Sequence, residues 1–258
     1  MAFTNILKRL ADKQIIVPIL ENQMRAEKWP DRMPFEVDTS PYYGTGDGYF
    51  HPSTHALLTA RQLYYEFHPD SAHLMEEEPY SFQKVMATTV GSAVHAVIQT
   101  QMKMTGLVGD DDIEVEYINE AHHVRGRADM VVHHPTEGPV LCEIKTRTSY
   151  KFGKTVAEDM DSWRAQVSLA CDNLSDRYGT DFTYGIVIMA EVGWPFRVEE
   201  QRVARDDALL EQIYSKFDYV RRAVANNEPP PVCCPYDSPT MRGCHARYAC
   251  WLKEVSGR

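Results

Sequence analysis

Two apolar segments that carry isolated charges constrain the fold of this chain most. They run over residues 126–132 and 140–146, and a turn containing Pro and Gly separates them. Such a pattern predicts two strands joined by a short connection. Because alternate side chains of a strand share a face, we expect Glu143 and Lys145 to point one way while Ile144 points into the core.

An acidic residue on the first of these strands, Asp129, can meet the charged pair on the second. Carboxylates hold hard divalent cations through oxygen, and an ammonium beside them can orient water or stabilise charge on a phosphate. The alternative is a solvated cross-strand charge pair. The apolar neighbours Val140, Leu141 and Ile144 argue against it, because charges on a buried strand need partners or a metal.

These residues resemble the PD-(D/E)XK nuclease core, in its RecB-like exonuclease branch. Asp129 and the run Glu143-Ile144-Lys145 match the central motif. Upstream, Gly91 to His95 resembles the helix that carries a metal-binding His in that branch. Downstream, Gln166 resembles the Gln motif, although the Tyr often found four residues later is Ala170 here.

A further segment, Arg61 to Tyr65, resembles the opening of the nuclease domain in the CRISPR-associated iron–sulfur exonucleases and their phage relatives. The resemblance spans about Pro52 to Cys250. It implies a metal-dependent DNA exonuclease that hydrolyses phosphodiester bonds and leaves a 5′-phosphate. A setting in phage or bacterial DNA recombination, replication or repair is implied by resemblance only.

The resemblance implies a role for each site residue. The Mg²⁺ or Mn²⁺ ligands would be His95, Asp129, Glu143 and the backbone carbonyl of Ile144, and a His nitrogen favours Mn²⁺. Lys145 would position water or neutralise the phosphate; its alternative is a simple salt bridge to Glu143. A lone His on an apolar helix can also be a satisfied core residue.

Four other side chains are candidates for contacts around the substrate. Gln166 would bond to a catalytic carboxylate or a DNA phosphate; the alternative is an exposed helix residue. Arg127, two residues before Asp129, shares its strand face and can meet a phosphate. Arg61 and Tyr64 are expected to contact the nucleic-acid backbone, unless the tyrosines of this segment simply pack a helix against the sheet.

Six cysteines are present. Cys142 and Cys171 lie in apolar segments and should be buried thiols, whereas Cys233, Cys234, Cys244 and Cys250 crowd into the last part of the chain. The iron–sulfur exonucleases have one early Cys, where Thr59-Ala60 stands here, and a late trio of which Met241 replaces one member. We expect the four late cysteines to hold a structural [4Fe–4S] cluster. Alternatives are zinc, held by three of these cysteines plus either the fourth or His245, or free thiols.

Net charge and composition limit the functions and locations that the chain can have. The charge of −10 is unfavourable for a nucleic-acid enzyme, but the acids concentrate at 76–78, 110–112 and 199–200 while basic residues gather at 145–154 and 242–253. No apolar run reaches membrane-span length. The start of the chain lacks a signal-peptide core, so we expect a cytoplasmic protein with no membrane partner.

The expected fold is α/β (α+β): a restriction-endonuclease-like core with a mixed central sheet flanked by helices. Expected domains are an N-terminal extension (1–50), the nuclease core (51–228) and a cysteine-rich segment packed on it (229–258). The pattern predicts helices over 53–67, 81–105, 159–174 and 206–225, and strands over 113–118, 124–133, 140–148, 184–191 and 196–203.

The expected partners are DNA ends or single strands, and other recombination or replication proteins. Two rival functions stay open: a DNA-end-binding module with weak or no catalysis, and a zinc-binding adaptor whose acidic face binds proteins.

Overall fold

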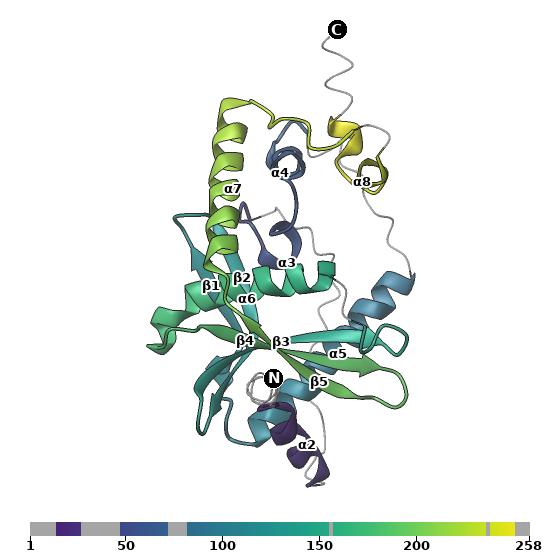
Figure 1. Ribbon diagram of the computed structural model, residues 1–258, viewed down its shortest axis with the longest axis vertical. Coiled ribbons are helices and arrows are strands. Elements are labelled where there is room, and N and C mark those ends of the chain that lie inside the picture. The colour runs from purple at the N-terminus through teal and green to yellow at the C-terminus, as the bar shows by residue number, and fades with distance from the viewer. Residues whose placement is uncertain (1–13, 27–46, 72–81, 155–156, 236–237, 251–258) are drawn as a thin grey trace, which may run out of the picture. The chain divides into compact units, whose positions relative to one another are not determined.

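The computed structural model describes residues 14–26, 47–71, 82–154, 157–235 and 238–250. In these residues it is an α+β fold with a mixed five-stranded sheet flanked by helices, as the sequence predicts (Figure 1). The strands are β1 (Ile113–Asn119), β2 (Val124–His134), β3 (Gly138–Thr148), β4 (Tyr184–Val192) and β5 (Val198–Ala204). The helical elements are α2 (Val17–Arg25), α3 (Pro52–His55), α4 (Ala60–Phe67), α5 (Phe82–Met104), the 3₁₀ turn η2 (Asp110–Asp112), α6 (Ala157–Tyr178), α7 (Asp207–Asn226) and α8 (Pro239–Arg242).

The strands lie in sequence order across the sheet, β1-β2-β3-β4-β5. Strand β3 is antiparallel to β2 and parallel to β4, and β4 is antiparallel to β5. A parallel pair cannot be joined by a tight turn, and α6 forms the crossover between β3 and β4. The strands expected at 184–191 and 196–203 correspond to β4, which is buried in the interior of the sheet, and β5, which lies at its edge.

The chain divides into two compact units, which are described separately. Unit 1 comprises Met1–Pro41, Phe82–Tyr117 and Gly126–Asp206, and unit 2 comprises Tyr42–Ser81, Ile118–Arg125 and Asp207–Arg258.

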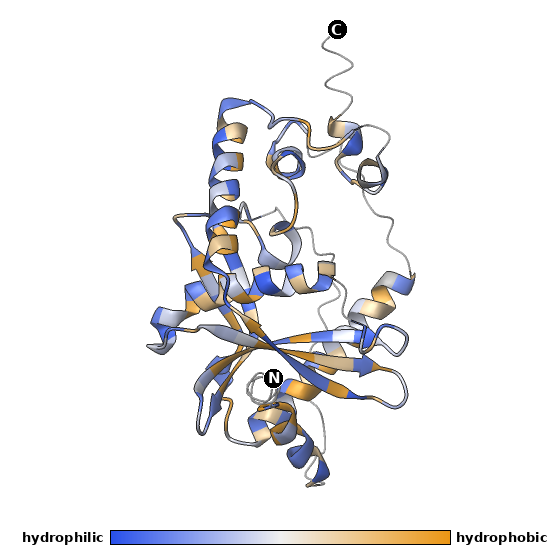
Figure 2. Ribbon diagram, viewed as in Figure 1, coloured by the Kyte–Doolittle hydropathy of each residue, from blue (hydrophilic) through white to orange (hydrophobic). Residues whose placement is uncertain are grey.

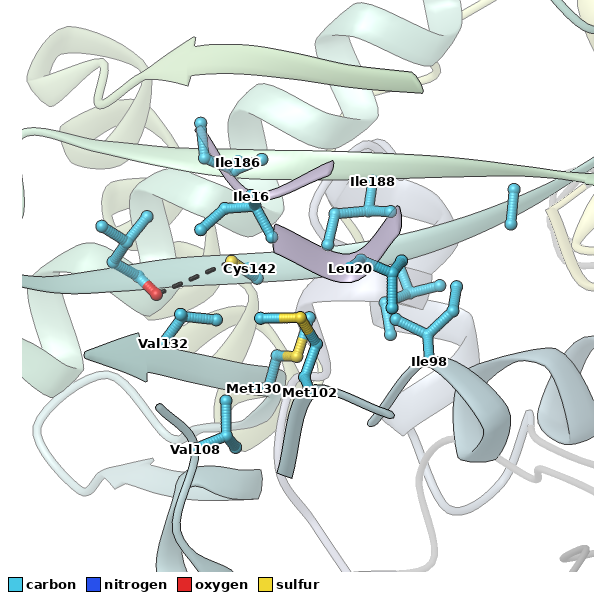
Figure 3. Packing of buried hydrophobic residues seen from close by; sticks show 13 residues of the cluster. Ile16, Leu20, Ile98, Met102, Val108, Met130, Val132, Cys142, Ile186 and Ile188 are labelled. Atoms are coloured by element: carbon cyan, nitrogen blue, oxygen red, sulfur yellow. Dashed lines mark hydrogen bonds between the residues drawn. The ribbon is translucent and has the colours of Figure 1, made fainter. Parts of the chain in front are cut away.

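The core of unit 1 lies between one face of the sheet and helices α2 and α5 (Figure 3). Strand alternation sends Cys142 and Ile144 of β3 to this face, and Ile144 is fully buried, as expected from its position between two charged residues. Helix α5 adds Ile98 and Met102. Each such side chain contributes about 1.5–3 kcal/mol when fully buried, so this face fixes how β3 sits in the sheet.

Helix α2 is attached to the edge of the sheet by a carboxylate. Glu200 of β5 accepts hydrogen bonds from the amides of Ile15, Ile16 and Val17, the last two at 2.8 and 2.7 Å. The first amides of a helix have no partner within it and carry partial positive charge. Glu200 therefore satisfies them and holds Ile16 in the core.

Helix α6 packs on strands β3, β4 and β5 of unit 1. The approach is close, because a Cβ built on Gly185 of β4 would lie 3.0 Å from a methyl group of Val167. The hydroxyl of Ser168 accepts a hydrogen bond of 2.9 Å from the amide of Asp206, which joins α6 to the residue after β5. Helix α6 is thus held near β3, and Gln166 immediately precedes Val167 on this helix.

Unit 2 is built around α7, whose hydrophobic and hydrophilic residues alternate along the helix (Figure 2). Its buried face includes Ile213, Phe217 and Val220. The ring of Phe50 stacks on that of Phe217 with 4.1 Å between centroids, and α4 packs against α7.

One predicted helix is corrected by the structure. The segment 53–67 is two helices, α3 and α4, not one. Thr59 begins α4 through a capping box in which its side chain accepts from the amide of Gln62 and the side chain of Gln62 accepts from the amide of Thr59. The ammonium of Lys216 donates to the carbonyls of Ala56 (2.6 Å) and Leu58 (2.9 Å), which the break leaves without helical partners.

The helices expected at 81–105, 159–174 and 206–225 correspond to α5, α6 and α7, and α6 extends further at its C-terminal end. Across the described ranges, every helix is too short or too polar to cross a membrane.

Candidate metal and nucleic-acid site

Asp129 of β2 lies at the centre of a polar cluster in unit 1. Its Oδ2 accepts a hydrogen bond from the backbone amide of Ile144 on the neighbouring strand. Its Oδ1 lies 3.4 Å from Nδ1 of His95 on α5. Strand pairing and helix packing thus bring together two residues that stand far apart in the sequence, and both were predicted from it.

Gln99 lies one helical turn after His95 and connects the same elements. Its side chain is buried, and its Nε2 donates to Oε1 of Glu114 (2.6 Å) and to the backbone carbonyl of Asp129 (2.9 Å). Residues four apart on a helix share a face, so α5 presents His95 and Gln99 together. Gln99 positions Glu114 against the strand that carries Asp129.

Glu114, which was not predicted from the sequence, completes a group of potential metal ligands. One ligand atom from each of His95, Glu114 and Asp129 lies within 4.8 Å of the others, and all three residues are partly buried. Glu114 has a φ of 50° at the start of β1, outside regular strand geometry. The only sequence signal for it is the alternating Glu114 and Glu116 on the strand predicted next to Asp129.

Arg127 pairs with this group: its Nε lies 2.6 Å from Oε2 of Glu114. About half of the Arg127 side chain is exposed. It shares the strand face of Asp129, as expected, but in the structure its charge faces a carboxylate.

A second hydrogen-bonded group lies on β3 and α6. Lys145 Nζ donates to Oε1 of Glu143 (2.7 Å) and to Oε1 of Gln166 (2.8 Å). Gln166 is itself held by Ser162, because its Nε2 donates to the Ser162 hydroxyl at 2.8 Å. Glu143 and Lys145 thus share one face of β3, and the predicted partner Gln166 meets them from α6.

Burial and charge act against each other on these groups. Burial raises the pKa of Glu143, the charge of Asp129 adds to this, and the result is a pKa of about 7 despite Lys145. Burial alone would lower the pKa of Lys145, but the carboxylates of Glu143 and Asp129 outweigh it and raise that pKa. The lysine therefore stays charged at neutral pH.

His95 and Asp129 stabilise each other's charged forms. Burial by itself would lower the pKa of His95, yet its contact with Asp129 raises it. Burial likewise would raise the pKa of Asp129, and His95 and Lys145 lower it instead. The cluster thus gathers three carboxylates, Glu114, Asp129 and Glu143, in a partly buried place.

Among side chains, the observed group has Glu114 where Glu143 was expected. Glu143 lies outside the three-residue group formed by the described residues, and its Oε1 is bonded to Lys145. Its place among the ligands, and that of the Ile144 carbonyl, stays a prediction. A histidine nitrogen with carboxylate oxygens is a donor set that suits Mn²⁺ and is compatible with Mg²⁺.

Two residues expected to touch nucleic acid are buried in unit 2. The Arg61 side chain donates to Cys250 Sγ (2.9 Å), to the Pro230 carbonyl and to the Tyr65 hydroxyl (3.2 Å). Tyr64 has no exposed surface, and its hydroxyl donates to Asn227. The alternative for the tyrosines, packing of their helix, agrees with the burial of Tyr64, although α4 packs against α7 and the late cysteines. Neither Arg61 nor Tyr64 is accessible to a DNA strand in this structure.

The four late cysteines gather around the first turn of α4, within unit 2. Cys233 Sγ and Cys234 Sγ are 3.7 Å apart, and Thr59 Oγ1 lies 3.6 Å from Cys233 Sγ. The amide of the Gln62 side chain donates to Cys244 Sγ at 3.3 Å. Thr59, the position where the resembled enzymes carry their early Cys, therefore has Cys233 beside it.

One pair of these sulfurs, Cys233 Sγ and Cys234 Sγ, already has a spacing that suits zinc. In a tetrahedral site with Zn–S of about 2.3 Å, neighbouring sulfurs lie roughly 3.8 Å apart. Across the described ranges, no three of Cys233, Cys234, Cys244, Cys250 and His245 bring ligand atoms within 4.8 Å of one another. His245 instead lies 3.7 Å from a carboxylate oxygen of Glu66.

Comparisons with known proteins give only distant likenesses. No family model matches the chain, and no curated protein matches its sequence. Among solved structures, a candidate exonuclease of Eubacterium rectale is 12% identical over 81% of this chain and 93% of its own, with a TM-score of 0.47. The protein SSO0001 is 15% identical over 95% of each chain, with a TM-score of 0.42.

An alkaline exonuclease of Laribacter hongkongensis is 16% identical over 67% of this chain and 89% of its own, with a TM-score of 0.34. Likenesses at this level assign neither a family nor an activity to the chain. Its function has to be argued from its own residues.

Proposed function

We propose that unit 1 is a divalent-metal-dependent nuclease that hydrolyses phosphodiester bonds in DNA. The observation that carries this proposal is the meeting of the His95, Glu114 and Asp129 ligand atoms in the same unit as the Glu143–Lys145–Gln166 group. Action from DNA ends, as an exonuclease, rests on the sequence resemblance alone. The same holds for a role in DNA recombination, replication or repair.

His95, Glu114 and Asp129 would hold the cation, and Gln99 keeps Glu114 in place through a hydrogen bond of 2.6 Å. When bound, a divalent cation supplies positive charge that stabilises negative charge developing on a phosphate. Three nearby carboxylates favour such a cation. Burial is the first cause of the raised pKa of Glu143, and the neighbouring charge of Asp129 is the second.

Lys145 and Glu143 have complementary roles in the proposed reaction. A lysine that stays protonated cannot act as a base, but its ammonium can hold the attacked phosphate or the water. A buried carboxyl with a pKa of about 7 can accept a proton from water at neutral pH. Gln166, which is held by Ser162, accepts a hydrogen bond from Lys145 and so orients its ammonium beside Glu143.

The direct test uses end-labelled DNA with Mn²⁺, Mg²⁺ or a chelator. We expect cleavage with either metal, none with the chelator, and none for Glu143→Gln or Lys145→Met. If neither metal supports cleavage of single-stranded or duplex DNA, the proposed function is wrong. DNA binding without cleavage would favour a DNA-end-binding module. A protein that does not bind DNA at all would favour the zinc-binding adaptor.

Glu114 offers a matched pair of variants for the ligand set. Glu116 stands two residues along the same strand and is exposed. Calorimetry with Mn²⁺ should show weakened binding for Glu114→Gln and wild-type binding for Glu116→Gln. Equal affinities for the two variants would remove Glu114 from the site.

For the cysteine cluster we propose a structural [4Fe–4S] cluster in preference to zinc. The resemblance to the iron–sulfur exonucleases supports this choice, and the four cysteines lie around the start of α4. Protein purified without oxygen should absorb broadly near about 400 nm and contain iron. Zinc in stoichiometric amount, with no such absorbance, would overturn the assignment.

A further inference from the structure

Three large aromatic side chains are exposed on two adjoining segments of unit 1. The exposed fractions are 79% for Tyr150, 84% for Trp194 and 64% for Phe196. We call these three residues the aromatic patch. Single exposed hydrophobic residues are common on proteins, but neighbouring aromatics of this size mark a binding surface.

The patch joins the segment after β3 to the turn between β4 and β5. The parallel strands β3 and β4 end in register, with Thr148 paired to Val192. Just beyond them, the Ser149 hydroxyl donates to the Trp194 carbonyl at 3.4 Å. The guanidinium of Arg197 lies 4.5 Å from the centre of the Phe152 ring, which is buried under it.

The β4–β5 turn is fixed by a buried carboxylate. Glu191 accepts from Arg197 at Nε (2.8 Å), at Nη2 (3.1 Å) and at the backbone amide (3.1 Å). The Phe196 amide closes the turn on the Gly193 carbonyl at 2.7 Å. The backbone that carries Trp194 and Phe196 is therefore held in place, so little order has to be imposed on the turn when a ligand binds.

The surroundings of the patch are basic although the protein is acidic. Residues 144–157 contain four basic side chains, of which Lys145 pairs with Glu143 and Arg147 with Asp159, so Lys151 and Lys154 carry the charge next to the patch. Lys154 Nζ lies 4.0 Å above the ring of Tyr150. The nearby acids are engaged, because Asp159 pairs with Arg147 at 2.7 Å and Glu191 with Arg197. A polyanion would thus meet positive charge here.

The patch begins close to the proposed catalytic group. Glu143, Lys145 and Arg147 share one face of β3, and Ser149 follows the strand. Four residues of strand from Lys145 to Ser149 cover about 13 Å. That distance is roughly four stacked nucleotide steps of about 3.4 Å.

We propose that the aromatic patch binds single-stranded DNA by stacking bases on Trp194 and Tyr150, with the adjacent lysines contacting phosphates. Aromatic rings interleaved with basic side chains bind single strands because every unpaired base has an exposed face. A duplex hides these faces. The inference rests on the proposed nuclease function and deepens it: the strand delivered to the catalytic group is single-stranded.

The test measures binding of a labelled oligothymidylate to the full chain in a chelator, so that no cleavage occurs. Trp194→Ala should weaken binding about tenfold or more, which is the loss expected for one stacked base. Trp194→Phe, which keeps a ring, should retain most of the affinity. Phe82→Ala removes an equally exposed aromatic elsewhere on unit 1 and should bind like the wild type.

A strand without bases separates stacking from charge. An abasic oligonucleotide should bind weakly to the wild type and with equal affinity to Trp194→Ala, and duplex DNA should compete poorly. Wild-type affinity in Trp194→Ala/Tyr150→Ala, undiminished binding of the abasic strand, or equal competition by duplex would each overturn the proposal. Melting temperatures of the variants exclude unfolding as the cause.

The binding and cleavage assays fail separately. Binding through the patch with no cleavage after Mn²⁺ is added would leave this inference standing and remove the proposed nuclease function. Cleavage with Mn²⁺, together with oligonucleotide binding that is unchanged in Trp194→Ala, would support the nuclease function and remove this inference.

Discussion

Replacing Arg61 with Met should destabilise unit 2 by about 3–5 kcal/mol. The Arg61 side chain is only 5% exposed and lies on α4. Its guanidinium donates to the sulfur of Cys250 (2.9 Å), to the carbonyls of Pro230 and Cys250, and to the Tyr65 hydroxyl. It therefore ties the segment after α7 and the last described turn to one helix.

The magnitude follows from those partners. A hydrogen bond from a charged group contributes about 1.5–3 kcal/mol, and a buried carbonyl left unpaired costs about 1–3 kcal/mol. Bonds from one guanidinium are not independent, and the two longest, at 3.2 and 3.4 Å, are weak. Counting the two shortest gives about 3–6 kcal/mol, close to the 3–5 kcal/mol measured when one partner of a buried charged pair is removed. A whole domain is stable by only about 5–15 kcal/mol.

Urea unfolding followed by circular dichroism measures the loss, and limited proteolysis near residues 231–238 reports loosening of the cysteine segment. Arg61→Lys keeps the charge but loses the fork, so it should fall between wild type and Arg61→Met. Arg222→Met, at an exposed position of α7, should stay within about 0.5 kcal/mol of wild type. A loss below about 1 kcal/mol in Arg61→Met, with weakened DNA binding, would refute the packing role.

Three shorter predictions concern other parts of the chain. His95→Ala should weaken Mn²⁺ binding at least about tenfold in calorimetry, since losing even an outer partner of a metal site costs that much. Unchanged affinity would mean that His95 is a core residue and not a ligand. Gly126→Ala should cost about 1–3 kcal/mol in urea unfolding, because the added Cβ would lie 2.3 Å from the ring of Tyr117, and Tyr117→Leu should recover part of it. Burial alone would raise the pKa of Glu66, but His245 and His55 outweigh it and lower that pKa to about 2. The stability from this lowered pKa, on the order of 3 kcal/mol, is present above about pH 4.5 and lost as the pH falls toward 2; Glu66→Gln should lose less stability over that range, and parallel curves would contradict the assignment.

Most of the fold follows from hydrophobic periodicity. The strands at 184–191 and 140–148 were predictable because long apolar runs bounded by turns have few other uses. The break between α3 and α4 was not, because the capping box at Thr59 lies inside an otherwise helical apolar pattern. Lys216 stabilises this break from a position far along the chain, and local periodicity carries no information on such a contact.

The site was predictable only where the strand pattern fixed the direction of a side chain. Glu143 and Lys145 followed from alternation, and their hydrogen bond is seen. Glu114 was missed because its role depends on which strand lies beside β2 and on a backbone with positive φ. The burial of Arg61 was missed for a related reason: its partners Pro230 and Cys250 are distant in sequence.

The register of β3 couples the core to the chemistry. In parallel pairing Ile144 stands opposite Ile188 and Lys145 opposite Met189. A shift of one residue would exchange the two faces of the strand, placing Lys145 in the cluster formed by Ile98 and Met102 and Ile144 against Gln166. Burying a charge without its partner costs several kcal/mol, and the apolar contacts of Ile144 would be lost as well. The hydrophobic pattern that pairs β3 with β4 therefore also aims Glu143 and Lys145 toward α6, and it sets where the chain leaves the strand to reach the aromatic patch.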